Sequence, residues 1–273
     1  MPITEKDIEG TKEFIRNIVN DSLTEGVVIG LSGGIDSALT AKLCVDALGL
    51  DKVYCVSLPC DSNPDDEVDA KLVAEWLGAE LHRLDLGNSF TNLASAIQYP
   101  RREKSPPSFK RLTFANMKSR LRMVALYTIA NEYNLLVVGT TNKSEWAVGY
   151  ATKYGDGGVD VEPIQDFFKT EVWEMSLMVG VPQKIIDRIP TAGLWDGQTD
   201  EAELGMDYYD LDAVLRTTIF SHNPTSSELD HFDDRLKVIE RVKDLWYKSA
   251  HKRKSPPHYK RPTDDGNDFL SFD

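Results

Sequence analysis

Gly30-Leu31-Ser32-Gly33-Gly34-Ile35-Asp36-Ser37 is the stretch that decides the fold, because it joins a strand pattern directly to a helix pattern. Residues 27–31 form a short β-branched run, as expected for a strand that is buried on both faces. Residues 37–48 follow as a predicted helix. Gly33 and Gly34 lack a Cβ, which is what a tight turn between the two elements requires. The sequence therefore predicts a glycine turn between a buried strand and a helix.

The same turn is suited to binding an anion. Free backbone N–H groups and the helix dipole favour negative charge at the start of a helix, and Ser32 and Ser37 add hydroxyl donors. Asp36 fits beside phosphate if it holds Mg²⁺ that bridges phosphate oxygens. The stretch has neither the Gly-Lys-Ser/Thr of a Walker A loop nor a Gly-x-Gly-x-x-Gly fingerprint. We interpret it as a phosphate-binding loop; the alternative is a glycine turn with a helix-capping serine.

Strand and helix patterns alternate along the first half of the chain. The predicted strands cover residues 27–31, 53–58, 81–85 and 135–139, and the predicted helices cover residues 7–23, 37–48, 65–77 and 114–131. Such alternation implies a parallel sheet with right-handed crossovers and helices on both faces. The predicted fold class is α/β, a doubly wound, mainly parallel sheet flanked by helices, in a single domain over residues 1–273.

Three segments are predicted to be mobile without a ligand. Residues 99–111 combine proline, serine and charge, and residues 196–210 are acidic and contain two glycines. The tail from about residue 251 has three prolines by Pro262 and ends in an acidic stretch.

Composition is that of an ordinary globular protein, with 273 residues of which 41% are hydrophobic and 27% charged. No apolar run approaches the roughly 20 residues that a membrane span requires, and the first residues lack the layout of a signal peptide. Cys44, Cys55 and Cys60 fit neither a disulfide framework nor a zinc pattern, and Cys44 and Cys55 are expected to be buried apolar side chains. We therefore expect a cytoplasmic protein that does not contact a membrane.

The net charge of −13 argues against nucleic-acid binding, yet positive charge is concentrated in two stretches. Residues 101–122 carry eight Lys/Arg against one acid, and residues 251–262 carry five against none. Solvated faces are the usual explanation of such runs. Because each stretch also holds one of the motifs described below, we interpret them as contacts for an anionic small molecule.

The Ser-Gly-Gly-x-Asp-Ser pattern at residues 32–37 resembles the PP-loop of the N-type ATP pyrophosphatases. Members of this superfamily cleave ATP between the α and β phosphates and adenylate a substrate oxygen. The resemblance implies an adenine nucleotide alpha hydrolase-like fold. It also implies ATP contacts from Gly30, Leu31, Ser32, Gly33, Gly34, Ile35, Asp36 and Ser37. The loop identifies the superfamily only.

Further motifs are spread along the chain. On the predicted helix 114–131, Asn116 and Arg120 are four residues apart and share a face. The apolar side chains expected to pack inward from this helix are Met117, Leu121 and Val124. The remaining motifs are residues 139–145 at the end of the fourth strand, the glycine-rich residues 152–160, residues 189–195, 197–201 and 203–205, and the pair His251-Lys252.

Ligands bind at the carboxyl edge of a parallel sheet. Asp36 and Glu145 would therefore arrive from two strand ends to hold one ion. The alternative for Glu145 is an acid in the first turn of a helix, where acids are favoured.

Together these motifs resemble the NAD⁺ synthetase family over residues 10–255, and the Lys-Tyr-Gly-Asp-Gly-Gly-Val-Asp run at residues 153–160 is the most discriminating of them. The resemblance implies ATP contacts from Thr140, Lys169 and Thr191, deamido-NAD⁺ contacts from Arg120, Lys153, Asp160, His251 and Lys252, and Mg²⁺ ligation by Asp36 and Glu145. Two stretches depart from the family pattern: residues 99–111 are longer and more basic, and the tail after Pro262 matches nothing in it.

The resemblance implies an ATP-dependent carbon–nitrogen ligase that amidates deamido-NAD⁺ with ammonia, the last step of NAD⁺ biosynthesis. ATP would adenylate the nicotinate carboxylate, and ammonia would attack the NAD-adenylate to give NAD⁺, AMP and pyrophosphate. The implied catalytic residues are Asp36, Lys169 and Asp160, of which Asp160 would orient or deprotonate ammonia. The implied cofactor is Mg²⁺, and the implied assembly is a homodimer.

Two alternatives stay open at this point. The first is another PP-loop adenylating enzyme, either GMP synthetase-like or tRNA-modifying, and the second is a non-catalytic ATP- or AMP-binding module. The nitrogen source is expected to be free ammonia, because the loop begins by residue 32 and leaves upstream room for one helix and one strand, too little for an amidase domain.

Overall fold

The structure is a computed structural model that describes residues 2–97, 107–195, 197–220 and 236–259. Within these residues the sheet has four parallel strands in the order β3-β2-β1-β4. The strands are β1 (Gly26–Gly30), β2 (Val53–Ser57), β3 (Leu81–Arg83) and β4 (Leu135–Val138). The chain winds outward from β1 to β3 and then crosses back to place β4 on the other side of β1. The predicted doubly wound parallel fold is confirmed, with its switch point between β1 and β4.

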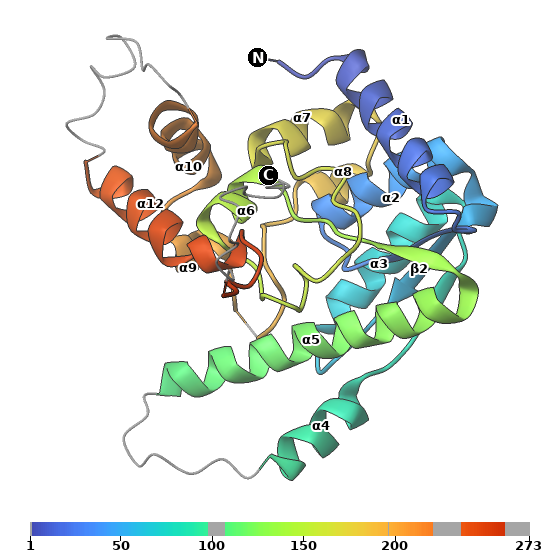
Figure 1. Cartoon of the computed structure of the whole chain (residues 1–273), viewed down its shortest axis with the longest axis horizontal. Coiled ribbons are helices and arrows are strands. Elements are labelled where there is room, and N and C mark those ends of the chain that lie inside the picture. The colour runs from blue at the N-terminus through green and yellow to red at the C-terminus, as the bar shows by residue number, and fades with distance from the viewer. Residues whose placement is uncertain (1, 98–106, 196, 221–235, 260–273) are drawn as a thin grey trace, which may run out of the picture.

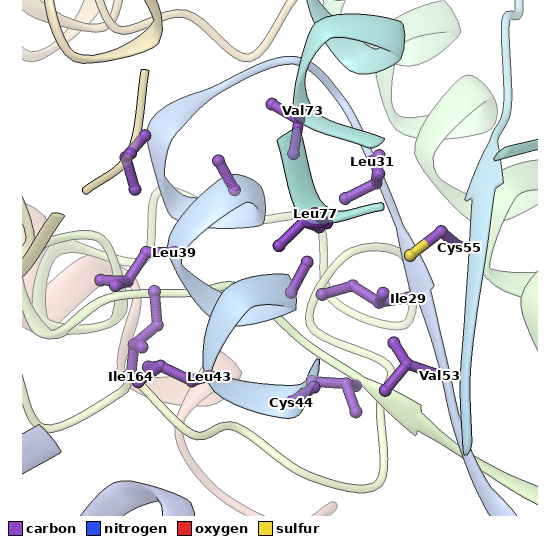
Figure 2. Close-up of a cluster of buried hydrophobic side chains, with 14 of the residues drawn as sticks. Ile29, Leu31, Leu39, Leu43, Cys44, Val53, Cys55, Val73, Leu77 and Ile164 are labelled. Carbon is purple, nitrogen blue, oxygen red and sulfur yellow. The ribbon is translucent and has the colours of Figure 1, made fainter. Parts of the chain in front are cut away.

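The sheet is buried on both faces, as its β-branched composition predicts. Because side chains alternate along a strand, Val27 and Ile29 of β1 pack into one hydrophobic core while Val28 packs into another. Figure 2 shows the first core, in which Ile29 lies near Val53 and Cys55 of the next strand, while Leu39 and Leu43 lie near Ile164.

The helices that supply the first core are α1 (Glu5–Asp21), α2 (Ile35–Leu48), α3 (Pro64–Leu77), α7 (Lys169–Met178) and α8 (Gln183–Ile186). The opposite face is covered by α4 (Gly87–Ala96) and the long helix α5 (Pro107–Tyr133), which runs across the molecule away from α1 and α2 (Figure 1). Between them these helices enclose the sheet and leave its carboxyl edge for the site.

A second group of helices lies beside the sheet rather than on it (Figure 1). Its members are α6 (Lys143–Val148), α9 (Asp200–Leu204), α10 (Tyr208–Val214), the π-helical turn η2 (Leu215–Ile219) and α12 (Leu236–Lys248). They share a separate apolar core around Tyr208, Leu211 and Val242. The described residues also include the 3₁₀ turns η1 (Leu50–Lys52) and η4 (Ala250–Lys252).

Helix α5 differs from its prediction in length and in orientation. It starts at Pro107 rather than at residue 114, so the end of the segment 99–111 is helical. Its buried stripe runs through Ala115, Ser119 and Ala125, whereas Val124 is 55% exposed. The prediction that Val124 packs inward is therefore wrong, because the stripe that faces the sheet begins with polar side chains near the site.

The other predicted mobile segments are also partly structured. Residues 196–210 contain α9 and the start of α10, and the beginning of the tail forms η4. Residues 99–106, residue 196 and the tail from residue 260 lie outside the described residues. Mobility of these segments stays a prediction.

Helix α4 was not predicted from the sequence. It packs on α5, where the Phe90 and Phe114 rings meet edge to face.

Cys44 and Cys55 are fully buried free thiols, which confirms their prediction as small core side chains. Among the described residues, no helix combines the length and the apolar character needed to cross a membrane.

Candidate active site

A cleft of about 960 Å³ opens at the carboxyl edge of the sheet, at the ends of the neighbouring strands β1 and β4. Its walls include the loop after β1, the segment after β2, the inward face of α5 and residues 188–195. Ligands of open α/β sheets bind at such a switch point, and the volume is at the upper end of the range for small-molecule sites. The fold therefore places the predicted loop in the wall of the main cleft of the described structure.

The glycine turn after β1 packs tightly on α3. Gly33 has a φ of 78°, and a Cβ at this position would lie 2.7 Å from the Asp69 Cβ. Ser37 Oγ donates to the Gly34 carbonyl at 2.9 Å and lies 3.1 Å from Ser32 Oγ. The two hydroxyls predicted as phosphate donors therefore also brace the loop, while α2 presents the unpaired N–H groups of a helix start.

A buried ion cluster lies at the end of this loop. The Nζ atom of Lys169 is 2.5 Å from Asp36 Oδ2 and 3.6 Å from Glu145 Oε1. The Asn142 side chain donates to Asp36 Oδ1 at 2.9 Å, and the Tyr208 ring lies 5.2 Å from the ammonium. Asp36 and Glu145 thus reach one point from two strand ends, as the sequence predicts, and Lys169 occupies the position between them.

The cluster holds more carboxyl groups than cations. Burial, and then the neighbouring Asp36 carboxylate, raise the pKa of Glu145 well above its usual range. Burial alone would lower the pKa of Lys169, but the Asp36 and Glu145 carboxylates outweigh it and raise that pKa. Asp200, at the start of α9, adds a third buried carboxyl, and burial raises its pKa although the Lys169 charge opposes this. One ammonium therefore faces three carboxyl groups in a largely buried part of the cleft wall.

The predicted nucleotide threonines both line the cleft. Thr140 follows the end of β4, and Thr191 lies in the loop after α8. The Thr191 hydroxyl accepts a hydrogen bond from the Gly193 N–H at 3.1 Å, which fixes its orientation.

The basic residues predicted from the C-terminal motif meet the glycine-rich loop. Lys153 Nζ donates to the His251 carbonyl at 2.6 Å. Lys252 Nζ donates to the Gly149 and Ala151 carbonyls at 2.7 and 2.6 Å and lines the cleft. The structure thus brings Lys153 close to His251 and Lys252, which lie about a hundred positions later in the sequence.

Arg120 and Asp160 do not line the cleft. Arg120 donates to the Lys153 carbonyl at 3.3 Å and lines a second, smaller hollow of about 290 Å³ between α4 and α5. The Asp160 carboxylate accepts hydrogen bonds from the Tyr127 hydroxyl at 2.9 Å and the Val137 N–H at 2.8 Å. For Arg120 and Asp160 to contact deamido-NAD⁺ in the cleft, a second copy of the chain or a different position of the two side chains is therefore required.

Two cations on the inward face of α5 were missed. Lys118 Nζ donates to the Asp61 and Leu194 carbonyls at 2.9 and 3.3 Å. Arg122 lines the cleft and donates to the Leu58 carbonyl at 3.0 Å, and burial lowers its pKa. The signal was the spacing of four between them, which places both on one side of the helix and Arg120 on another.

Asp200 and Arg188 were missed as well. Asp200 begins α9, which has only five residues, and Arg188 lies in the loop after α8, so neither segment has a periodicity that marks an inward side. Asp200 accepts a hydrogen bond from the Tyr208 hydroxyl at 2.9 Å. Arg188 donates to the Gly33 carbonyl of the phosphate-binding loop at 3.3 Å.

Glu162 is an unusual acid beside the site. A Cβ at Gly139 would lie 2.4 Å from its carboxyl carbon, so the glycine at the end of β4 makes room for it. Glu162 Oε2 accepts a hydrogen bond from the Thr141 N–H at 3.1 Å. Burial raises the pKa of Glu162 to about 8, although the Thr141 hydrogen bonds oppose the shift.

Comparison with known proteins gives consistent matches. The family model described as NAD synthase matches residues 7–256. The NH₃-dependent NAD⁺ synthetase of Methanosarcina acetivorans is 46% identical over 253 residues, which cover 90% of this chain and 94% of that protein.

Two solved structures resemble this one over nearly their whole length. The NMN synthetase of Francisella tularensis has a TM-score of 0.80 and 32% identity, and the match covers 94% of this chain and 98% of that one. The NH₃-dependent NAD synthetase of Campylobacter jejuni, solved with a nitrate ion, has a TM-score of 0.75 and 27% identity at the same coverage of 94% and 98%.

We predict that Glu162→Gln removes a pH dependence of folding. The folded-state pKa of about 8 exceeds the ordinary value of 4.5, so the neutral carboxyl favours the folded state. This contribution is complete below about pH 4.5 and is lost as pH rises through about 8, at ~1.4 kcal/mol per unit of pKa difference. The neutral amide of the variant does not titrate. Urea unfolding from pH 5 to 9 should show the variant gaining stability relative to the unaltered protein as pH rises.

Glu132→Gln on the exposed end of α5 is the matched control and should run parallel to the unaltered protein. Parallel curves for Glu162→Gln as well would contradict the buried neutral carboxyl.

Proposed function

This chain belongs to the NAD synthase family, and we propose that its cleft amidates deamido-NAD⁺ with ammonia in an ATP-dependent reaction. The observation that carries this proposal is the Asp36–Lys169–Glu145 cluster at the end of the phosphate-binding loop, at the switch point of the sheet. Family membership favours this reaction over a GMP synthetase-like or tRNA-modifying enzyme and over a non-catalytic nucleotide-binding module. The product would be NAD⁺, formed in the last step of its biosynthesis.

The chemistry needs an activated carboxylate. A nicotinate oxygen attacks the α-phosphorus of ATP, the bond to the β-phosphate breaks, and pyrophosphate leaves. Ammonia then attacks the acyl carbon, AMP departs and a proton is lost. In this proposal the N–H groups at the start of α2 and the Lys169 ammonium bind the phosphates, and they stabilise the charge that develops on pyrophosphate.

The same cluster fits a divalent cation. With all three acids ionised, the carboxylates of Asp36, Glu145 and Asp200 would leave two negative charges uncompensated by Lys169, and uncompensated buried charge is costly. Within the described residues, no three acids, histidines or cysteines are placed so that they could hold a metal ion by themselves. Mg²⁺ commonly takes one or two carboxylates, waters and substrate phosphates. We propose that Asp36 and Glu145 are its protein ligands, where Mg²⁺ would neutralise phosphate charge.

For the dinucleotide we propose Lys153, His251 and Lys252 as one binding group, because Lys153 bonds the His251 carbonyl and the next residue, Lys252, lines the cleft. Arg120 on α5 and Asp160, which bonds Tyr127 of the same helix, are both exposed. The apolar hollow beside Arg120 includes exposed Ile97 and Val124. A second copy of the chain packed on this hollow would cover the exposed apolar surface and could enclose both residues. We therefore propose a homodimer with its dinucleotide site at the interface.

A second substrate deserves a direct comparison, because the Francisella tularensis structure is named an NMN synthetase. That name suggests nicotinate mononucleotide, which has the same reacting carboxylate but lacks the adenylate half.

The function is tested by incubating the purified protein with ATP, Mg²⁺ and ammonium, with either deamido-NAD⁺ or nicotinate mononucleotide, and detecting products by mass. We expect kcat/KM for deamido-NAD⁺ to exceed that for the mononucleotide by about tenfold or more, or ~1.4 kcal/mol. Glutamine freed of ammonium should give no product. The reverse preference would assign the mononucleotide, and sustained turnover with that glutamine would overturn the use of free ammonia.

Asp36→Asn and Glu145→Gln should each lower deamido-NAD⁺-dependent ATP–pyrophosphate exchange by about 100-fold or more, since each removes a charged ligand at the phosphates. The Mg²⁺ concentration for half-maximal exchange should rise in both. Asp46→Asn, an exposed acid on the same helix as Asp36, is the control and should leave exchange unchanged. Ordinary exchange and an ordinary Mg²⁺ requirement in the two site variants would refute their assignment as metal ligands.

The dimer is tested with two substitutions of equally exposed apolar side chains. Val124→Lys lies in the hollow beside Arg120 and is 55% exposed, whereas Leu177→Lys on α7 is 58% exposed and lies elsewhere. Sedimentation at micromolar concentration should show a dimer for the unaltered protein and for Leu177→Lys, and a monomer with weak deamido-NAD⁺ binding for Val124→Lys. A fully active monomer would exclude a shared site.

A further inference from the structure

We propose that Arg188 is a positioning residue for ATP, which fixes the phosphate-binding loop and the Thr191 loop to one another. The proposal rests on the proposed function in so far as ATP is the ligand of this cleft. Arg188 is the last residue before the segment that carries Thr191, and its guanidinium lies against the opposite wall.

The guanidinium makes three hydrogen bonds to two different segments. Nη1 donates to the Gly33 carbonyl at 3.3 Å and to Asp69 Oδ2 at 3.0 Å, and Nη2 donates to Asp66. The side chains are largely enclosed, with exposed fractions of 20% for Arg188, 18% for Asp66 and 8% for Asp69. A planar fork with several fixed donors suits this arrangement better than a lysine would.

The contact with Gly33 determines the shape of the phosphate-binding loop. Gly33 is pressed on α3, since a Cβ there would lie 2.8 Å from the Asp66 carbonyl oxygen. The Gly33 carbonyl and the Gly34 N–H belong to one planar peptide unit, so holding the carbonyl also fixes the direction of the N–H. That N–H donates to Ser32 Oγ at 3.2 Å, and Ser32 is braced in turn against Ser37. Arg188, which itself lines the cleft, thereby anchors the loop.

The contact with Asp66 determines the position of the Thr191 loop. Asp66 Oδ2 would be 3.2 Å from a Cβ at Gly193, so this loop passes directly over the same carboxylate. The Gly193 N–H in turn donates to Thr191 Oγ1. One guanidinium with two carboxylates therefore joins the two loops through the first turns of α3.

This linkage prepares the site before ATP arrives. Two loops that move independently would have to be ordered on binding, which weakens affinity. The expected consequence of losing Arg188 is a selective loss of ATP affinity, because the proposed dinucleotide residues Lys153 and Lys252 bond other segments than those that Arg188 contacts. A charge-assisted network of this kind corresponds to roughly a 10- to 100-fold change in affinity.

The chain supplies a matched control. Lys184 also bonds Asp69, with Nζ 2.6 Å from Oδ1, but its side chain is 61% exposed. It precedes Arg188 in the same segment, and its ion pair is with α3 alone. An exposed pair of this kind contributes little.

The test compares Arg188→Met, Arg188→Lys and Lys184→Met by calorimetric titration with Mg²⁺–ATP and, separately, with deamido-NAD⁺. We expect Arg188→Met to raise the Kd for ATP by about 10- to 100-fold, while the Kd for deamido-NAD⁺ changes by less than about twofold. Arg188→Lys should recover part of the loss, and Lys184→Met should match the unaltered protein. ATP binding is measured without turnover, so failure of the amidation assay would not decide the role of Arg188.

Unpaired Asp66 and Asp69 could instead destabilise the fold, so the double variant Arg188→Met/Asp66→Asn is included. It removes one of the two carboxylates while the link stays broken, and its melting temperature should recover towards that of the unaltered protein. Weak ATP binding in this stable variant supports a positioning role. Recovery of ATP binding together with the melting temperature, equal losses for both ligands, or an equal effect of Lys184→Met would each overturn it.

Discussion

The buried contact of Lys169 with Asp36 and Glu145 is the constraint on which the remainder of the site depends. It joins the helix after β1, the helix after β4 and the first residue of α7 at one point. A buried charge left without its partner destabilises a protein by several kcal/mol, so these three elements must keep their relative positions. The second group of helices supports this arrangement. Asp212 of α10 accepts hydrogen bonds from the Ser144 hydroxyl and from the Thr170 N–H, and thereby fixes the starts of α6 and α7.

The sequence was sufficient for the features that follow from chain order. A β-branched run, a pair of glycines and a helix pattern specify a strand, a tight turn and a helix, and the alternation of such units specifies a parallel sheet. Once the sheet is parallel, all strands end at one edge. The proximity of Asp36 and Glu145 could therefore be predicted although the two residues are 109 positions apart in the sequence. In the structure both lie close to the Lys169 ammonium. Their role as metal ligands stays a proposal.

The sequence was insufficient to predict which side of a helix faces inward where the helix carries both an apolar and a polar stripe. On α5 the apolar stripe with Val124 was the natural choice for the inward side, but the helix directs Lys118, Ser119 and Arg122 toward the sheet edge and the cleft. Burial of polar side chains is offset there by hydrogen bonds to the loops after β2 and α8, which periodicity cannot reveal. Arg188 was not predicted as a site residue for a related reason. Its partners lie more than a hundred positions away, in the loop after β1 and in α3.

The cations of the cleft fall into two classes according to what holds them. Arg122 and Lys252 donate to backbone carbonyls, which orient a cation without cancelling its charge, and burial lowers the pKa of both. Arg188 is held by two carboxylates, which do cancel it. The first class keeps positive charge available for an anionic ligand, whereas the second fixes the frame around it. A chain with a net charge of −13 needs this division, because its overall field opposes the approach of nucleotides. Salt screens that field over about 8–10 Å, so inside the cleft the attraction must come from cations already in place.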